Sequence, residues 1–284
     1  MLVGTDYPCK ATIDVKGCPP EFKNIPCNDV LARRAMSYFL YDNEVKLNQR
    51  FTLKGEEASH LLRSRRIQPG ELIEIQDTSH QRFQCQVESV SKRELILRSA
   101  EQVIPPAESP LKLHLYQALI REKPLEIILQ KSTELGATSI NLFQSRYSQR
   151  LKKDPAKSGQ RWQKICIEAC KQSGRTTPPA IHFFESIDAV FQTIQSKTAV
   201  PPALCFSTSD QGTRLDQLHL DSNEVNLLIG PEGGWFENEL APLDPLHVNL
   251  GQRILRSETA AVTAVALLQF LFGDLSASTE SSSI

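Results

Sequence analysis

The stretch VNLLIGPEGGWFENEL, residues 225–240, decides the fold of the C-terminal part of this chain. A mostly apolar run ends at Gly230, and Pro231, Glu232, Gly233 and Gly234 follow before the sequence becomes acidic and amphipathic. This pattern predicts a buried strand followed by a loop in which the main chain can approach a ligand closely. The number of glycines alone is equally typical of a tight turn between a strand and a helix.

A second stretch, VNLGQRILRSETAAVTAVALLQF at residues 248–270, supplies another loop of the same kind. A short strand ends at Gly251, two arginines (Arg253 and Arg256) flank aliphatic residues, and Ser257 or Thr259 can cap the apolar helix that follows. Charge just before a buried helix is costly unless an anionic or carbonyl-rich group binds there. The alternative is a capped core helix preceded by solvated arginines.

Between these loops and residue 110, strands alternate with helices. The expected strands cover residues 111–119, 137–145, 203–209 and 225–230, and the expected helices cover 122–136 and 158–174, each ending at a glycine. Alternation of this kind predicts an α/β domain with a parallel sheet, whose ligands bind at the carboxyl ends of the strands. The loop after residue 229 falls at such a position.

The segment after Met36 has a different texture. Short alternating segments separated by turn residues predict a small β-barrel or sandwich with one short helix in 55–66. Three prolines make 101–110 a linker. Residues 1–35 have no clear periodicity and lack the apolar stretch of a signal peptide, and 276–284 are expected to be a flexible tail.

Bulk composition excludes several classes of protein. The 284 residues carry a net charge of −1, which argues against a globally basic nucleic-acid coat but leaves room for a local basic face. The seven cysteines are odd in number and include no C-x-x-C pair, so we expect reduced thiols, a cytoplasmic location and no metal. The longest apolar run, 260–272, is too short to span a bilayer.

Taken in order, LLIGPEGGWFENEL and LGQRILRSETAAVTAVALLQFLFGDL resemble the RsmE family of methyltransferases in the SPOUT superfamily. Further matches are KPLEIILQKSTELGATSI, SQR at 148–150 and RWQKICIEACKQSGR ahead of Pro178. LKGEEASHLLRSRRIQPGELIEIQD is similar to the family's PUA-like RNA-binding barrel. The resemblance covers residues 36–275, and the 35-residue leader lies outside it.

The resemblance implies a PUA-like β-barrel over 36–105 and a SPOUT methyltransferase domain over 110–275. The latter is an α/β domain tied in a trefoil knot, and it forms a homodimer with its cofactor sites near the subunit interface. Members of this family use S-adenosylmethionine to methylate N3 of a uridine in 16S ribosomal RNA. The expected partners are therefore 16S ribosomal RNA or the small ribosomal subunit and a second copy of the chain, with no membrane.

The resemblance also implies site residues, carried over position by position. Those expected around the cofactor are Leu204, Phe206, Ser207, Gly230, Pro231, Glu232, Gly233, Leu250, Gly251, Arg253, Ile254, Leu255 and Arg256. Two basic clusters in the sequence are expected to bind RNA. One is Arg63, Arg65 and Arg66 in the barrel, and the other begins with Arg146 and Arg150 and continues through Lys152, Lys153, Lys157, Arg161 and Lys164. For each basic cluster the competing interpretation is an ordinary solvated face.

The expected catalytic residues are Arg256 and Glu232. Uridine N3 is a poor nucleophile until its proton leaves, so the site needs a proton acceptor and groups that stabilise charge on O2 and O4. Arg256 and Arg253 suit the second role, and Arg256 is the one expected to act in catalysis. Glu232 either accepts the proton or holds the loop or the cofactor, and the second role is slightly favoured because a glycine-rich loop needs a side chain to fix it.

Two other functions fit the same two-domain organisation. One is a non-enzymatic RNA-binding factor of ribosome assembly, against which the intact glycine and arginine loops argue. The other is a methyltransferase of the same superfamily acting on transfer RNA, against which the barrel match and RILRSETA argue by resemblance.

Overall fold

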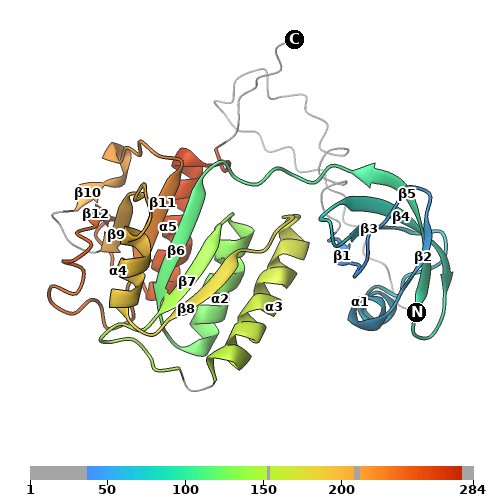
Figure 1. Ribbon diagram of the computed structural model, residues 1–284, viewed down its shortest axis with the longest axis horizontal. Helices are drawn as coiled ribbons and strands as arrows, with labels where there is room; N and C mark the ends of the chain where they lie inside the picture. Colours follow the sequence, from blue (N-terminus) through green and yellow to red (C-terminus); the bar gives the residue numbers. More distant parts are fainter. Residues whose placement is uncertain (1–36, 152–153, 208–211, 277–284) are drawn as a thin grey trace, which may run out of the picture. The chain divides into compact units, whose positions relative to one another are not determined.

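The computed structural model describes residues 37–151, 154–207 and 212–276. The expectations for residues 1–35 and for the tail after residue 276 lie outside these ranges. Within them, two sheets are formed, each with its own hydrophobic core (Figure 1). None of the helices in these ranges is long and apolar enough to cross a membrane.

The N-terminal sheet has the strand order β1-β3-β4-β5-β2 among the described residues. Its strands are β1 (Phe39–Leu40), β2 (Arg50–Leu53), β3 (Leu72–Gln76), β4 (Arg82–Val90) and β5 (Leu95–Val103). All neighbours are antiparallel except β1 and β3, and register shifts between Gln84 and Cys85 and between Val87 and Ser89 bend the long β4–β5 ladder. Alternate side chains such as Ile73, Ile75 and Leu97 fill the core on one face, as the period-two pattern predicts.

The predicted helix in 55–66 is confirmed, with one modification. Helix α1 (Gly55–His60) continues directly into a π-helical turn, Leu61–Arg65. Arg66 ends the segment in the left-handed region, with φ of 51°. Arg63 and Arg65 therefore lie in the last turn, where positive charge is favoured by the helix dipole.

The C-terminal sheet is entirely parallel, with the order β10-β12-β9-β11-β6-β7-β8 among the described residues. Its strands are β6 (Lys112–Ala118), β7 (Ser139–Phe143), β8 (Ala180–Phe184), β9 (Ala203–Ser207), β10 (Thr213–Arg214), β11 (Glu224–Ile229) and β12 (Leu246–Asn249). The α/β fold with a parallel sheet is thus confirmed. The sequence analysis did not predict β8 or β10.

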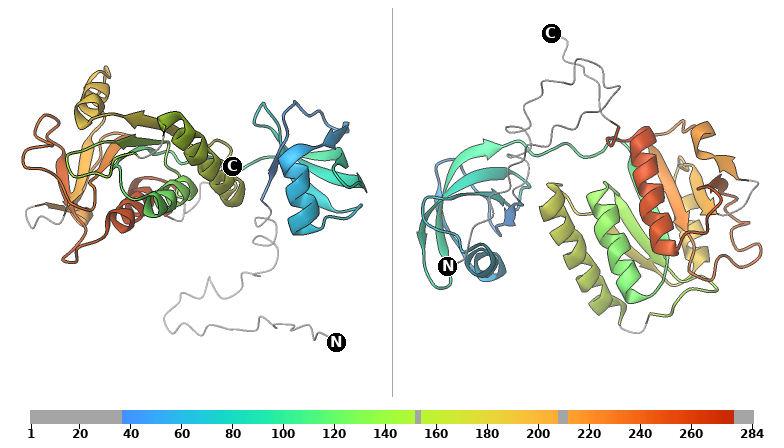
Figure 2. Two further views of the ribbon diagram at one scale, coloured as in Figure 1. Left: turned by 90° about the horizontal axis from the view of Figure 1, so that it is seen from below. Right: turned by 180° about the vertical axis from the view of Figure 1, so that it is seen from behind.

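Helices cover both faces of this sheet. Helices α2 (Glu122–Glu134), α3 (Pro155–Ser173) and α5 (Ser257–Phe272) pack side by side on one face, and α4 (Ile187–Gln195) packs on the other (Figure 2). Alternate residues of β11 face the two layers: Leu227 and Ile229 contact the three-helix side, and Leu228 contacts the α4 side. Strands covered on both faces are apolar throughout, which explains the run at 225–229.

The predicted helix ends are confirmed at two glycines. Gly136 and Gly174 have φ of 90° and 80°, a conformation that costs other residues free energy, and they follow α2 and α3. Helix α3 begins earlier than predicted, because Pro155 fits its first turn and the Asp154 carboxylate accepts a hydrogen bond from the Ala156 N–H at 2.9 Å.

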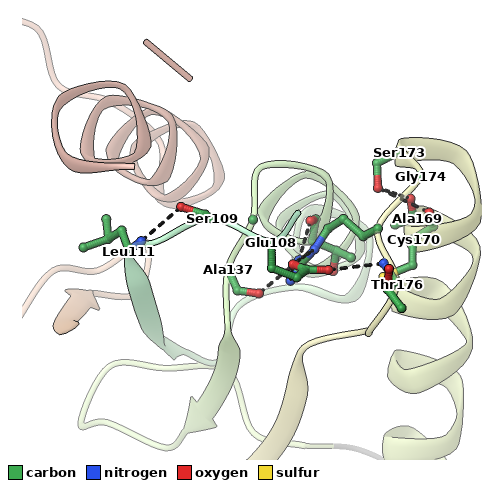
Figure 3. Close-up of polar contacts among 12 residues, drawn as sticks. Glu108, Ser109, Leu111, Ala137, Ala169, Cys170, Ser173, Gly174 and Thr176 are labelled. Carbon is green, nitrogen blue, oxygen red and sulfur yellow. Dashed lines mark hydrogen bonds and ion pairs between the residues drawn. The ribbon is translucent and has the colours of Figure 1, made fainter. Parts of the chain in front are cut away.

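The segment that enters β6 is fixed by polar contacts (Figure 3). The Glu108 carboxylate accepts from the guanidinium of Arg175 at 2.7 and 2.8 Å and from the Thr176 N–H at 3.2 Å. Arg175 Nη1 also donates to the carbonyls of Thr133 and Ala137, at 2.7 and 3.0 Å. One arginine thereby joins the chain before β6, the end of α2 and the turn after α3, which fixes the segments that lead into the amino ends of β6, β7 and β8.

Helix α5 has two unlike apolar sides. One side is buried in the core against the sheet and consists of Ala261, Ala264, Val265 and Leu268. The other side carries Phe270 and Leu271, which are exposed on the surface of the single chain, Phe270 by 54%. The predicted apolar helix after the second loop is confirmed as α5, and Leu268 packs in the core of this domain.

Candidate active site

A cavity of about 700 Å³ opens at the carboxyl edge of the parallel sheet. It lies where β9 and β11 end and where α2 and α5 begin, the position at which parallel sheets bind ligands. Its walls combine apolar side chains, main-chain groups of two loops and four charged residues. The lining residues are Arg121, Pro124, Phe206, Ile229, Gly230, Pro231, Glu232, Gly234, Trp235, Ile254, Leu255, Arg256, Ser257, Glu258 and Ala260.

The glycines of the first loop have separate structural reasons. A Cβ added at Gly230 would lie 3.0 Å from Cε2 of Trp235, so only glycine lets the indole pack against the main chain there. Gly234 has φ of 73° and its N–H donates to the Pro231 carbonyl at 3.0 Å, closing a turn. Between β11 and β12 the described chain forms turns and no helix. The loop is therefore built to bring the main chain and Trp235 to the cavity wall.

Ser257 fastens this loop to the start of α5. Its hydroxyl donates to the Gly230 carbonyl at 2.7 Å and accepts from Gln117 Nε2 at 3.0 Å. The prediction that Ser257 or Thr259 caps α5 is wrong: the N-cap is Arg256, and no side chain makes a capping hydrogen bond. The Ser257 hydroxyl is instead used between the sheet and the glycine loop.

Four charged residues surround the cavity. Glu232 from the first loop lies 4.0 Å from the guanidinium of Arg121, on the turn between β6 and α2. Arg256 precedes α5, and Glu258 is in its first turn. The sequence analysis did not predict Arg121 as a site residue, because it lies more than a hundred residues before the glycine loop and carries no motif of its own.

The structure brings together part of the predicted cofactor set. Phe206, Gly230, Pro231, Glu232, Ile254, Leu255 and Arg256 line the cavity. Gly233 packs against Tyr147 instead: a Cβ added to this glycine would lie 3.1 Å from the Cβ of Tyr147. Leu204 is buried in the core beneath, and Leu250 packs against that core.

The remaining predicted cofactor residues belong to the strand ends and the second loop. Ser207 pairs with Asn249 at the ends of β9 and β12. Gly251 has φ of 100° and its N–H donates to Asn249 Oδ1 at 2.5 Å. Arg253 follows on the same loop but is not among the cavity's lining residues.

The predicted RNA-binding arginines lie in two places. Arg63 lines a shallow hollow on the N-terminal sheet together with Lys92 and Arg93, which the sequence analysis did not single out. The guanidinium of Arg65 lies 5.5 Å from the ring centre of Phe39.

The second place is the segment after β7. Arg146 and Arg150 line a hollow of about 660 Å³ there. Further along the predicted basic cluster, Arg161 pairs with Glu122 and Glu126, and Lys164 pairs with Glu56 at 3.0 Å, which removes much of their net charge.

The cavity suits a ligand with a flat apolar part and a polar, charged part. Phe206, Ile229 and Leu255 provide apolar walls. The loop after Ile229 provides main-chain groups at close range, because Gly230 and Gly234 lack Cβ atoms. The carboxylates of Glu232 and Glu258 share the cavity with the guanidinium groups of Arg121 and Arg256, so the cavity offers partners for both signs of charge.

Fold and site together define an RNA methyltransferase. The family model described as the RNA methyltransferase domain matches residues 107–269, and the RNA methyltransferase PUA domain matches residues 53–98. The N-terminal sheet is therefore of the PUA type, as predicted.

Individual relatives narrow the class. The chain is 30% identical to ribosomal RNA small subunit methyltransferase E of Buchnera aphidicola subsp. Schizaphis graminum, over 87% of this chain and 98% of the relative. It is 29% identical to the Bacillus subtilis protein of the same name, over 78% and 90%. A crystal structure of ribosomal RNA small subunit methyltransferase E from Neisseria gonorrhoeae bound to S-adenosyl methionine superposes with a TM-score of 0.74 at 29% identity, covering 84% of this chain and 99% of that one. This chain belongs to the ribosomal RNA small subunit methyltransferase E family.

Proposed function

We propose that this chain methylates N3 of a uridine in 16S ribosomal RNA, with S-adenosylmethionine as the methyl donor. The cavity at the carboxyl edge of the sheet carries the proposal, because the glycine loop, the arginine loop and the start of α5 converge there. The Neisseria gonorrhoeae relative, bound to S-adenosyl methionine, supports the choice of donor. The names of the relatives support the small-subunit RNA as substrate.

The residues around the cavity fit the proposed cofactor. Phe206, Ile229 and Leu255 suit the faces of an adenine ring, and the main chain around Gly230 suits its polar edge and the ribose. When bound, S-adenosylmethionine supplies an activated methyl group on a positively charged sulfur. Glu232 and Glu258 stabilise positive charge in this cavity.

We assign the catalytic roles to Arg256 and Glu232. Loss of the N3 proton leaves negative charge on the O2 and O4 atoms of uracil, and the Arg256 guanidinium stabilises that charge by hydrogen bonding. Glu232 lies beside Arg121, and we favour a role in holding the loop and the cofactor. A carboxylate at this place also suits the alternative role of proton acceptor.

Two copies of the chain form the proposed active assembly. Phe270 and Leu271 on α5 and Ile127 on the neighbouring α2 are exposed apolar side chains, and a second copy that covers them removes this surface from water. The trefoil knot around the two cavity loops belongs to the same proposal.

The proposal extends to the organisation of the chain and to its substrate contacts. We propose a PUA-like RNA-binding domain over 36–105, a methyltransferase domain over 110–275 and a cytoplasmic location. Arg63, Arg65, Arg66, Arg146 and Arg150 contact the RNA, and the hollow lined by Arg63, Lys92 and Arg93 supports the first part of that set.

The test is transfer of labelled methyl groups to small ribosomal subunits from cells that lack this protein. The wild-type chain should label 16S RNA, and Arg256→Ala should lower the single-turnover rate by about 10²–10³-fold with cofactor affinity nearly unchanged. Arg214→Ala is the control for loss of an arginine charge, because Arg214 is exposed, pairs with Asp216 and does not line the cavity. Labelling of transfer RNA alone would refute the substrate, and loss of cofactor binding in Arg256→Ala would move that arginine to the cofactor site.

The role of Glu232 requires a separate pH series. Glu232→Gln keeps the shape of the side chain and one acceptor, so it should lose little rate if the carboxylate holds the loop. A variant that binds the cofactor normally but reacts only at high pH would show that Glu232 is the base.

A further inference from the structure

Two aromatic rings lie exposed beside the cavity. Tyr147, on the segment after β7, is exposed by 51%, and Phe236, on the segment after β11, by 44%. Their ring centres are 6.1 Å apart in an edge-to-face arrangement, and the guanidinium of Arg146 lies 5.3 Å from the ring centre of Phe236. Aromatic side chains that stay this exposed next to a site commonly serve as binding surfaces.

One carboxylate holds the two segments together. Glu239 accepts the main-chain N–H of Arg146 through one oxygen and that of Phe236 through the other, both at 2.9 Å. Segments that are 90 residues apart in the chain are therefore fixed to each other by a side chain whose two oxygens are both used. The main chain that carries the rings does not have to be ordered when a ligand arrives, which lowers the entropic cost of binding.

The rings adjoin the proposed active site directly. Gly233 packs against the Cβ of Tyr147, and the next residues, Gly234 and Trp235, line the cavity. On its other side the aromatic pair adjoins the hollow after β7, which is lined by Arg146 and Arg150 and also by one carboxylate, Glu185. The surface thus runs from the cavity through two rings to two arginines.

We propose that Tyr147, Phe236 and Arg146 form a stacking surface for an unpaired base of the RNA next to the target nucleotide, with Arg150 on its phosphate. This inference rests on the proposed function. A base whose N3 is methylated must leave its pairing partner, so its neighbours lose stacking that the protein has to replace. Aromatic rings and guanidinium planes provide that replacement for any base.

The charge on the surface favours RNA over a protein partner. Glu239 keeps its negative charge while it accepts two main-chain N–H groups, and among the described residues that line the hollow Glu185 is the one carboxylate. The guanidinium groups of Arg146 and Arg150 at its wall are therefore still open to a phosphate. A phosphate chain complements such a surface, whereas a purely apolar partner would leave the guanidinium groups without counter-charges.

Leucine and aromatic replacements separate stacking from simple contact. Tyr147→Leu with Phe236→Leu keeps apolar bulk without π faces, and Tyr147→Phe with Phe236→Tyr keeps the rings. Val200→Ala, at an exposed apolar side chain outside the site, is the control for loss of surface contact. Filter binding measures affinity for a 16S RNA fragment that contains the modified nucleotide, and calorimetry measures affinity for S-adenosylmethionine.

The leucine pair should bind the RNA between about fivefold and a hundredfold more weakly, with unchanged cofactor affinity. The variant that exchanges the two rings, Tyr147→Phe with Phe236→Tyr, and the control Val200→Ala should bind the RNA like wild type. If the variant with both leucines bound the RNA like wild type, the proposal would be overturned. It would also be overturned if that variant changed its oligomeric state in sedimentation, because the rings would then belong to an interface between two copies of the chain. Failure of the proposed function is a different result, in which wild type itself transfers no methyl group to 16S RNA.

Discussion

Replacing Ser257 with alanine tests whether the start of α5 holds the glycine loop in its binding conformation. The hydroxyl donates to the Gly230 carbonyl at 2.7 Å and accepts from Gln117 Nε2 at 3.0 Å. Alanine is well tolerated in helices, so the substitution removes two hydrogen bonds and little else.

The expected loss of stability follows from the burial of the two partners. Gln117 is fully buried, and its amide keeps only the bond to the Ala118 carbonyl at 2.8 Å, so one buried N–H loses its partner at a cost of about 1–3 kcal/mol. Gly230 lines the cavity, where water can replace the hydroxyl, so its share is about 0.5–1 kcal/mol. A total of about 1.5–4 kcal/mol lowers the Tm of a domain of this size by roughly 3–16 °C.

Thermal unfolding and calorimetry with S-adenosylmethionine measure the two consequences. The cofactor Kd should rise about tenfold, which corresponds to about 1.4 kcal/mol spent on restoring the loop. Ser173→Ala is the matched control, because that hydroxyl donates to the carbonyls of Ala169 and Cys170 within its own helix, α3. Its stability change should stay within about 0.5 kcal/mol. A Ser257→Ala chain with wild-type Tm and a cofactor Kd within twofold would refute the reasoning.

Three further predictions concern pH, packing and assembly. Burial, and then nearby lysine charges, hold the pKa of His114 below its usual 6.5. The unfolded chain therefore binds more protons than the folded one as pH drops below 6.5, so Tm should fall there. In a series of Tm against pH, His114→Gln should flatten that fall, and an unchanged slope would contradict this. Gly230→Ala should displace the adjacent indole and weaken cofactor binding in calorimetry at least tenfold. In Gly159→Ala the added Cβ meets nothing within 4 Å, so this variant should stabilise the chain by about 0.5–1 kcal/mol. Equal stability and equal cofactor affinity in the two variants would contradict this packing argument. Phe270→Glu should give folded monomers by sedimentation, and a stable dimer would exclude that face of α5 from the interface.

The main elements of the fold could be predicted because their signals are local. The apolar run before Gly230, the glycines after α2 and α3 and the bounds of α5 each follow from a few adjacent residues. Strand β8 was missed because it is an edge strand with half-exposed residues, so neither a continuous apolar run nor a clear alternation marks it.

The site could be predicted only where its residues are close in the sequence to a glycine loop. Arg121 was missed because it reaches the cavity through the pairing of β6 with β11, in which Gln117 lies opposite Ile229. Ser257 was assigned to the wrong partner, since its hydroxyl bonds to groups 27 and 140 residues away. Helix α5 is apolar on most sides, so its sequence does not distinguish Leu268, which is buried in the core of the domain, from Phe270, which is exposed.

The most direct test of the central claim is mass spectrometry of nucleosides from 16S ribosomal RNA of cells with and without this protein. The account predicts one N3-methyluridine that disappears when the gene is deleted and returns with the wild-type chain but not with Arg256→Ala. An unchanged N3-methyluridine content in the deletion strain, with the loss of a modified nucleoside from transfer RNA instead, would contradict it.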